Sequence, residues 1–275
     1  MVAVRGLVLG GGGVPGIAAH LGFLRGLSEA GVSWDVVVGI SAGGIVAGGL
    51  AAGLTLDAME HQWRHVVHSA WSLVPREVVH LLFSLRPSPT PGLLDLTWVV
   101  QQTSVGRKLF VNEWVPGYGV VVSDVTDGCS VLVSHDHPVV EWTVDALVAT
   151  AAFPGLFSGV RAPNGHLLVD GGLYSEMPVW AAAMLGATRV VVVRIGRATS
   201  GVPGLTTLDE LFWVLADQLA QRSSPTTAPA SVPQRVVELP TRGGLLSLAE
   251  WDRDYSVGYE TAKAQAADLE SFWSA

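Results

Sequence analysis

The stretch VVVGISAGG (residues 36–44) contains a GxSxG pattern directly after a run of β-branched residues. Small residues that suit the start of a helix follow it, which is the strand, sharp turn and helix context that makes such a match meaningful. Glycine is needed at positions 39 and 43 because the backbone there turns too tightly for a Cβ atom. The stretch therefore predicts that Ser41 presents its hydroxyl group at the turn, as a candidate nucleophile.

Two further motifs supply the rest of an acyl-transfer site. The glycine-rich segment GGGGVPG (residues 10–16) follows an apolar run, and such a turn can direct backbone N–H groups at developing negative charge. The motif DGG (residues 170–172) ends the apolar run 167–169 and places a carboxylate at the end of a strand. A nucleophile, oxyanion donors and a carboxylate together predict a serine acyl hydrolase.

The base that activates Ser41 has to be chosen between a carboxylate and a histidine. In the α/β-hydrolase order of serine, acid and histidine, Asp170 cannot serve because no histidine follows position 166. Asp124 or Asp136 with His137 or His166 remains an alternative, and Asp-Gly is also a common turn dipeptide. A Ser41–Asp170 dyad needs fewer assumptions, and we expect it.

Composition limits the class of protein. The chain has 275 residues, of which 49% are hydrophobic and 15% charged, with a mean hydropathy of +0.41. A formal net charge of −8 argues against a nucleic-acid partner. Cys129 is the only cysteine, so no intrachain disulfide is possible. A reducing, cytoplasmic compartment is the simpler expectation, and no secretory signal is visible.

Two strand-to-helix units at the N-terminus predict a mostly parallel α/β sheet. We expect one domain over residues 1–275, with a helical insertion or lid at about 56–115 that contains an apolar stripe between residues 74 and 85. The expected strands are 4–9, 36–38, 119–123, 130–134, 167–169, 190–195 and 235–238. The expected helices are 16–30, 43–52, 144–151, 179–185, 208–221 and 258–272.

Three other interpretations are weaker. Residues 36–56 are uncharged over a length that could span a membrane, but their glycines favour a buried strand, turn and helix. His61, His65 and His68 have helical spacing without a convincing carboxylate or cysteine partner for a metal. The segment 11–16 also matches a dinucleotide fingerprint, yet Asp35 precedes the next strand rather than ending it.

The motifs at 11–16, 39–43 and 170–172, with ATAAFPGLF (residues 149–157), occur in an order that resembles the patatin-like phospholipase family. The resemblance covers roughly residues 4–53 and 120–195. It implies a three-layer α/β/α patatin-like fold, no metal or organic cofactor, and a Ser–Asp dyad that acts on acyl esters. A lipid substrate would bring transient contact with a membrane surface. The oligomeric state cannot be read from the sequence.

Carried onto this chain, the resemblance assigns a role to each motif residue. The catalytic residues are Ser41 and Asp170, the oxyanion donors are the amides of Gly11, Gly12, Gly13 and Ala42, and the supporting residues are Gly16, Gly39, Gly43, Gly171 and Gly172. Family members usually have arginine or lysine where Pro15 stands, so neutral esters, lysolipids and acyl thioesters are open as substrates. An acyltransferase using the same Ser41 acyl-enzyme is the alternative activity, and a catalytically silent binding protein is a third interpretation.

Overall fold

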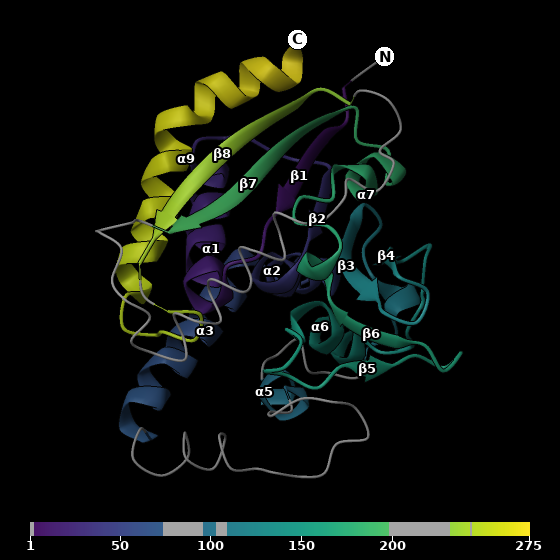
Figure 1. Cartoon of the computed structure of the whole chain (residues 1–275). Coiled ribbons are helices and arrows are strands. Elements are labelled where there is room, and N and C mark those ends of the chain that lie inside the picture. Colours follow the sequence, from purple (N-terminus) through teal and green to yellow (C-terminus); the bar gives the residue numbers. More distant parts are fainter. Residues whose placement is uncertain (1–2, 74–95, 103–108, 198–231, 243) are drawn as a thin grey trace.

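A mixed β-sheet forms the centre of the protein (Figure 1). The computed structural model describes residues 3–73, 96–102, 109–197, 232–242 and 244–275. Within these residues the strand order is β5-β6-β3-β2-β1-β7-β8, and β4 pairs with β3 outside this path. The strands are β1 (Arg5–Leu9), β2 (Val36–Gly39), β3 (Tyr118–Asp124), β4 (Cys129–Ser134), β5 (Val160–Arg161), β6 (Leu167–Asp170), β7 (Arg189–Arg197) and β8 (Gln234–Thr241).

The centre of the sheet is parallel and one side of it is antiparallel. β1 pairs in parallel with β2 and β7, β2 with β3, and β7 with β8. β3 pairs in antiparallel fashion with β4 and β6, and β6 with β5. The prediction of a mostly parallel sheet is therefore confirmed for the strand-to-helix units, whereas the segment from β4 to β6 adds antiparallel strands.

Side chains of the central strands alternate between two helical layers. Leu7 and Leu9 of β1 pack with α1 and α9, while Val8 between them packs with α7 on the opposite face. Parallel strands buried on both faces read as continuous apolar runs, which is the pattern that this sequence has. These layers make the three-layer α/β/α arrangement. The helices are α1 (Gly13–Glu29), α2 (Ser41–Ala51), α3 (Leu56–Leu73), α5 (Thr97–Gln102), α6 (Thr143–Ala151), α7 (Val179–Met184) and α9 (Trp251–Ser274), with short 3-10 turns at Val111–Glu113 and Gly171–Leu173.

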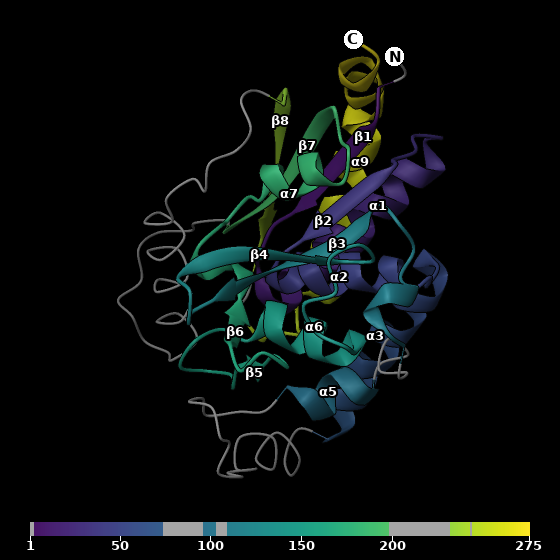
Figure 2. The ribbon, with the colours of Figure 1, turned by 90° about the vertical axis from the view of Figure 1, so that its right-hand side faces the viewer.

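The predicted insertion begins as a helix. α3 follows α2, and α5 lies beside α6, which in turn packs against α2 (Figure 2). The apolar stripe predicted between residues 74 and 85 and the helix predicted at 208–221 lie outside the described residues. The function of the insertion as a lid stays a prediction.

Three helices begin two or more residues earlier than the sequence pattern predicts. α1 begins at Gly13 rather than residue 16, α2 at Ser41 rather than 43, and α9 at Trp251 rather than 258. For α1 and α2 the reason is that the motif residues themselves form the first helical turn. The apolar segment 36–56 is divided between β2, α2 and the start of α3, and in the described part of the chain no helix is long and apolar enough to cross a membrane.

The contact between α1 and α9 depends on glycines. A Cβ atom at Gly258 of α9 would clash with the carbonyl oxygen of Ala19 in α1, and one at Gly22 would clash with the carbonyl of Tyr255. The two helix backbones therefore touch directly. Trp273 and Leu269 of α9, both fully buried, complete this layer of the core.

Replacing Gly258 with alanine should lower the free energy of unfolding by roughly 1–3 kcal/mol, because the added methyl group forces the helices apart. In an uncrowded helix the same change would instead stabilise by about 1 kcal/mol. Thermal and urea denaturation measure the effect. Gly196→Ala is the control, since a Cβ there meets no atom within 4 Å. A Gly258→Ala protein as stable as the wild type would contradict this packing.

Candidate active site

Ser41 lies at the turn between β2 and α2, here called the elbow turn (residues 39–43). It is the one non-glycine residue of the described chain with a positive φ, at 50°. A Cβ at Gly43 would clash with the carbonyl of Leu9, and one at Gly39 with the carbonyl of Gly43. The backbone of the elbow turn thus packs against the end of β1. This close approach holds Ser41 in a left-handed conformation, which costs on the order of 1 kcal/mol for a side chain of this kind.

Thr150 of α6 anchors the Ser41 backbone. The Ser41 amide donates to Thr150 Oγ1 at 3.2 Å, and the threonine hydroxyl donates to the carbonyl of Val121 at 2.7 Å. Thr150 is fully buried. The sequence motifs gave Thr150 no function, because 109 residues separate it from Ser41 and no local pattern indicates the contact.

The glycine turn (residues 10–13) joins β1 to α1 beside Ser41. Gly12 and Gly13 have φ values of 150° and 60°. A Cβ at Gly12 would lie 2.7 Å from Ile195 Cγ2, and one at Gly13 would clash with the carbonyl of Leu245. Both positions therefore require glycine. A Cβ at Gly11 would be 3.5 Å from Ser41 Cβ and 3.9 Å from its Oγ, so the turn borders the hydroxyl group directly.

Backbone amides at this junction are available to a ligand. Among the described residues, the N–H groups of Gly11, Gly12, Gly13 and Ala42 have no acceptor. Gly12 is the N-cap of α1, and Ala42 lies in the first turn of α2, where amides lack partners within their helix. The positive ends of two helix dipoles add to the attraction for negative charge.

Asp170 reaches the same place from β6. Because β6 runs antiparallel to β3, its last residue lies opposite Val122, close to the elbow turn. The carboxylate accepts a hydrogen bond from the Gly172 amide at 2.8 Å, and the Ser41 side chain lies near enough to favour its charged form. Burial raises the pKa of Asp170 to about 6, although the Gly172 amide and the Ser41 side chain both favour its charged form. Gly171 allows the backbone to pass the carbonyl of Val121, where a Cβ would clash.

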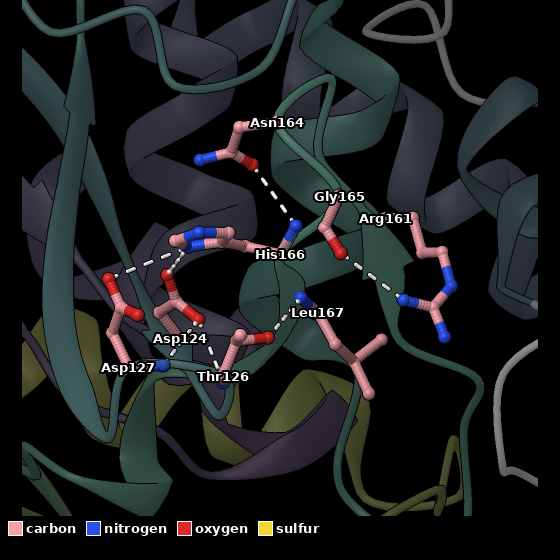
Figure 3. A network of polar contacts seen from close by, with 8 residues as sticks. All are labelled: Asp124, Thr126, Asp127, Arg161, Asn164, Gly165, His166 and Leu167. Atoms are coloured by element: carbon pink, nitrogen blue, oxygen red, sulfur yellow. Dashed lines mark hydrogen bonds and ion pairs between the residues drawn. The ribbon is translucent and has the colours of Figure 1, made fainter.

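The histidines considered as alternative bases for Ser41 make their contacts away from the dyad. His166 Nδ1 lies 2.6 Å from Asp124 Oδ2 and 3.6 Å from Asp127 Oδ2, in a network at the β3–β6 edge (Figure 3). His137 Nδ1 pairs with Ser134 at 3.0 Å, and His135 pairs with Asp136. None of these contacts involves Ser41 or Asp170. The structure brings together the serine and the carboxylate of the predicted dyad, and it pairs these histidines with other groups.

Asp124, Asp127 and His166 are also the group in the described chain whose spacing could hold a metal ion. Asp124 Oδ1 accepts from the amides of Thr126 and Asp127, so its carboxylate is already used to close the β3–β4 turn (Figure 3). The Asp124 contact raises the pKa of His166. His61 and His65 lie on α3, and the side chain of His68 is outside the described residues.

The motif residues that were given a catalytic, oxyanion or supporting function lie around this junction. Ser41, Ala42, Gly39, Gly43 and Gly16 surround the contact between the elbow turn and α1, where a Cβ at Gly16 would be 3.1 Å from that of Ala42. Gly171 and Gly172 directly follow Asp170 and begin the 3-10 turn Gly171–Leu173. A hydroxyl beside a buried carboxylate, next to unpaired amides, is an arrangement suited to acyl transfer.

Comparison with known proteins agrees with this arrangement. Residues 7–183, more than half of the chain, match the family described as Patatin-like phospholipase. The chain is 26% identical over 243 residues to neuropathy target esterase sws of Drosophila melanogaster, covering 83% of this chain and 15% of that protein. It is 28% identical over 238 residues to lysophospholipase NTE1 of Saccharomyces cerevisiae, covering 82% of this chain and 13% of that protein.

The chain thus spans about one seventh of the length of these relatives. Among solved structures, VipD from Legionella pneumophila has the same fold, with a TM-score of 0.57 and 15% identity over 99% of this chain and 67% of that one. The family match runs from β1 to α7 and includes the elbow turn, the glycine turn and Asp170. The chain belongs to the patatin-like phospholipase family.

Proposed function

We propose that this chain is a serine acyl hydrolase that cleaves carboxylic esters of lipids with Ser41 and Asp170 as its catalytic dyad. The proximity of the Ser41 side chain to the buried Asp170 carboxylate, beside the amides of the glycine turn, is the observation on which the proposal rests. A serine hydroxyl is a poor nucleophile until a base accepts its proton, and Asp170 is the titratable group that contacts it.

In the acylation step, Ser41 Oγ attacks the ester carbonyl carbon while Asp170 accepts the hydroxyl proton. A carboxylate with a pKa of about 6 is a stronger base than an ordinary aspartate and is still mostly ionised at neutral pH. When the tetrahedral intermediate collapses, the bond to the leaving alcohol breaks and Asp170 returns the proton to that oxygen. The product is a Ser41 acyl-enzyme.

The negative charge of the tetrahedral intermediate needs donors that are already in place. The amides of Gly11, Gly12, Gly13 and Ala42 are the candidates, since they border Ser41 at the start of two helices. Loss of a single oxyanion donor typically costs about 3 kcal/mol of transition-state stabilisation. Backbone donors are fixed by the fold and require no reorganisation during the reaction.

Deacylation repeats the chemistry with water as the nucleophile. Asp170 accepts a proton from the water that attacks the acyl-enzyme, and then returns it to Ser41 Oγ as the serine bond breaks. Each step uses residues of this chain together with water.

The substrate class follows from the family and its relatives. An esterase and a lysophospholipase among the relatives support a lipid ester, and cleavage of such a lipid would require contact with a membrane or micelle surface. Pro15 occupies the first turn of α1, where its missing N–H is tolerated. It also adds no positive charge beside the site. This supports neutral or lysolipid substrates over anionic head groups.

An acyltransferase would form the same acyl-enzyme and pass it to an alcohol, amine or thiol. The described residues contain no feature that identifies such an acceptor, so we propose hydrolysis. Product analysis with candidate acceptors in excess separates the two activities. Free fatty acid as the sole product supports hydrolysis, and acylated acceptor would establish transfer.

Ser41→Ala should reduce hydrolysis of a p-nitrophenyl ester and of lysophosphatidylcholine on the order of 10³-fold or more, because the nucleophile is lost. Its thermal stability should stay close to that of the wild type. Ser256→Ala, on the exposed face of α9, is the control and should keep full turnover. Residual Ser41→Ala activity near the wild-type level would remove Ser41 from the mechanism.

Asp170→Asn should lower kcat roughly 10²–10⁴-fold, because an amide cannot accept the serine proton. His166→Ala is the matched comparison, since it removes the shortest carboxylate–histidine contact of the described chain without touching the dyad. It should retain most of its turnover. A folded His166→Ala protein as slow as Ser41→Ala would favour a histidine base.

The Asp170 pKa also predicts two pH effects. In the wild type, kcat/KM should fall below about pH 6 as the carboxylate becomes protonated.

A carboxyl whose pKa is raised by folding stabilises the protein while it is protonated, and this contribution is lost as the pH rises through about 6. Asp170→Asn should therefore be more stable than the wild type at pH 8, by at most about 3 kcal/mol, and the difference should shrink at pH 4. Equal stabilities at pH 8, measured by urea denaturation, would contradict the buried charge.

A further inference from the structure

His20 of α1 is a fully buried histidine to which the proposed chemistry gives no function. Its Nε2 lies 2.8 Å from the carbonyl oxygen of Gly10, at the start of the glycine turn. Side chains on a helix lean toward its N-terminus, so the imidazole reaches back along α1 to the segment that precedes the helix. The ring therefore links α1 to the residue from which the glycine turn starts.

The chemistry of the two groups determines where the proton is. A carbonyl oxygen can only accept a hydrogen bond, so Nε2 carries the proton and donates a hydrogen bond to the carbonyl oxygen of Gly10. Burial lowers the pKa of His20 to about 4, which keeps the ring neutral at physiological pH. Nδ1 is then unprotonated, and among the described residues it has no hydrogen-bond partner. His20 is consequently a neutral donor with a fixed tautomer.

The two peptide units that flank the Gly10 Cα are both held by hydrogen bonds. The Gly10 carbonyl also accepts from the Gly43 amide of the elbow turn at 3.1 Å, and the Gly10 amide donates to Val193 of β7 at 2.9 Å. One carbonyl thus receives a donor from α1 and a donor from the elbow turn. These contacts connect the glycine turn, the nucleophile and the central sheet.

The direction of this carbonyl fixes the direction of the next amide. The Gly10 C=O and the Gly11 N–H belong to the same planar trans peptide unit and point in opposite directions. Neither glycine has a side chain that would restrain rotation of this plane. Hydrogen bonds to the carbonyl are therefore what orients the Gly11 N–H, which is a proposed oxyanion donor bordering Ser41.

We infer that His20 is a positioning residue for acyl transfer, which orients the Gly11 amide by donating to the Gly10 carbonyl. This inference rests on the proposed function. His20 does not touch the reacting atoms, and its Nε2 faces a carbonyl rather than the dyad. It acts on the rate by keeping an oxyanion donor in the direction that the tetrahedral intermediate requires.

Replacement of His20 should lower the catalytic rate without a large loss of stability of the fold. A buried Nδ1 without a partner costs free energy, so an apolar side chain of similar length should not destabilise the fold strongly. A purely structural histidine would behave in the opposite way, with stability lost and the rate per folded molecule unchanged.

The test compares His20→Gln with His20→Met. Glutamine places an amide N–H donor about as far from the backbone as Nε2, whereas methionine has similar length and no donor. His20→Met should lower kcat about 10- to 100-fold with KM within about twofold, because misdirection of a catalytic group has effects of this size. His20→Gln should recover most of kcat. Thermal denaturation of each variant provides the stability readout.

Two results would overturn the inference: a folded His20→Met protein with wild-type kcat, or a folded His20→Gln protein as slow as His20→Met. If neither variant folds, ¹⁵N NMR of the wild type decides. The inference requires the Nε2-protonated neutral tautomer with a slowly exchanging proton, and the Nδ1-protonated tautomer would contradict it. Failure of the proposed function is distinct, because it would appear as wild-type protein without Ser41-dependent turnover.

Discussion

The close approach of two backbones at the ends of β1 and β2 is the constraint on which the site depends. The backbone of Gly43 lies against the Leu9 carbonyl, and its amide donates to the carbonyl of Gly10. This contact places the glycine turn beside the elbow turn and holds Ser41 in its left-handed conformation. A side chain at position 43 would separate the two turns, and the nucleophile would leave the amides that it needs.

The site combines features that favour reaction at the expense of stability. Ser41 has an unfavourable φ, Asp170 is a buried carboxyl that must ionise, and His20 has a buried nitrogen without a partner in the described chain. Each of these lowers the stability of the folded state by a modest amount. The extensive core around the parallel strands and the α1–α9 contact compensates for them. Such local violations of the usual rules are typical of functional sites.

Sequence patterns were sufficient for the parts of the site that depend on local backbone geometry. The elbow turn, the glycine turn and Asp170 each follow an apolar strand and contain glycines that a tight turn requires, so short motifs predict them. Thr150 and His20 were not predicted to have functions. Thr150 meets Ser41 across 109 residues, and a histidine within an apolar helix gives no sign of the carbonyl that it contacts.

The fold shows the same division. Strand-to-helix units near the N-terminus are local and were predicted, whereas the antiparallel pairing of β3 with β4 and β6 depends on contacts distant in sequence. The sequence pattern predicts late starts for α1 and α2 because glycine and serine have low helix propensity, yet these residues form the first turns of both helices. Tertiary contacts with neighbouring strands override that propensity.

The central claim is that Ser41 is the nucleophile and that Asp170 activates it. Peptide mapping by mass spectrometry, after reaction with a fluorophosphonate ester, tests this claim most directly. The account predicts a single adduct on Ser41, formed at a rate that falls sharply in Asp170→Asn and is unchanged in His166→Ala. An adduct on another serine, or undiminished labelling of Ser41 in folded Asp170→Asn, would contradict it.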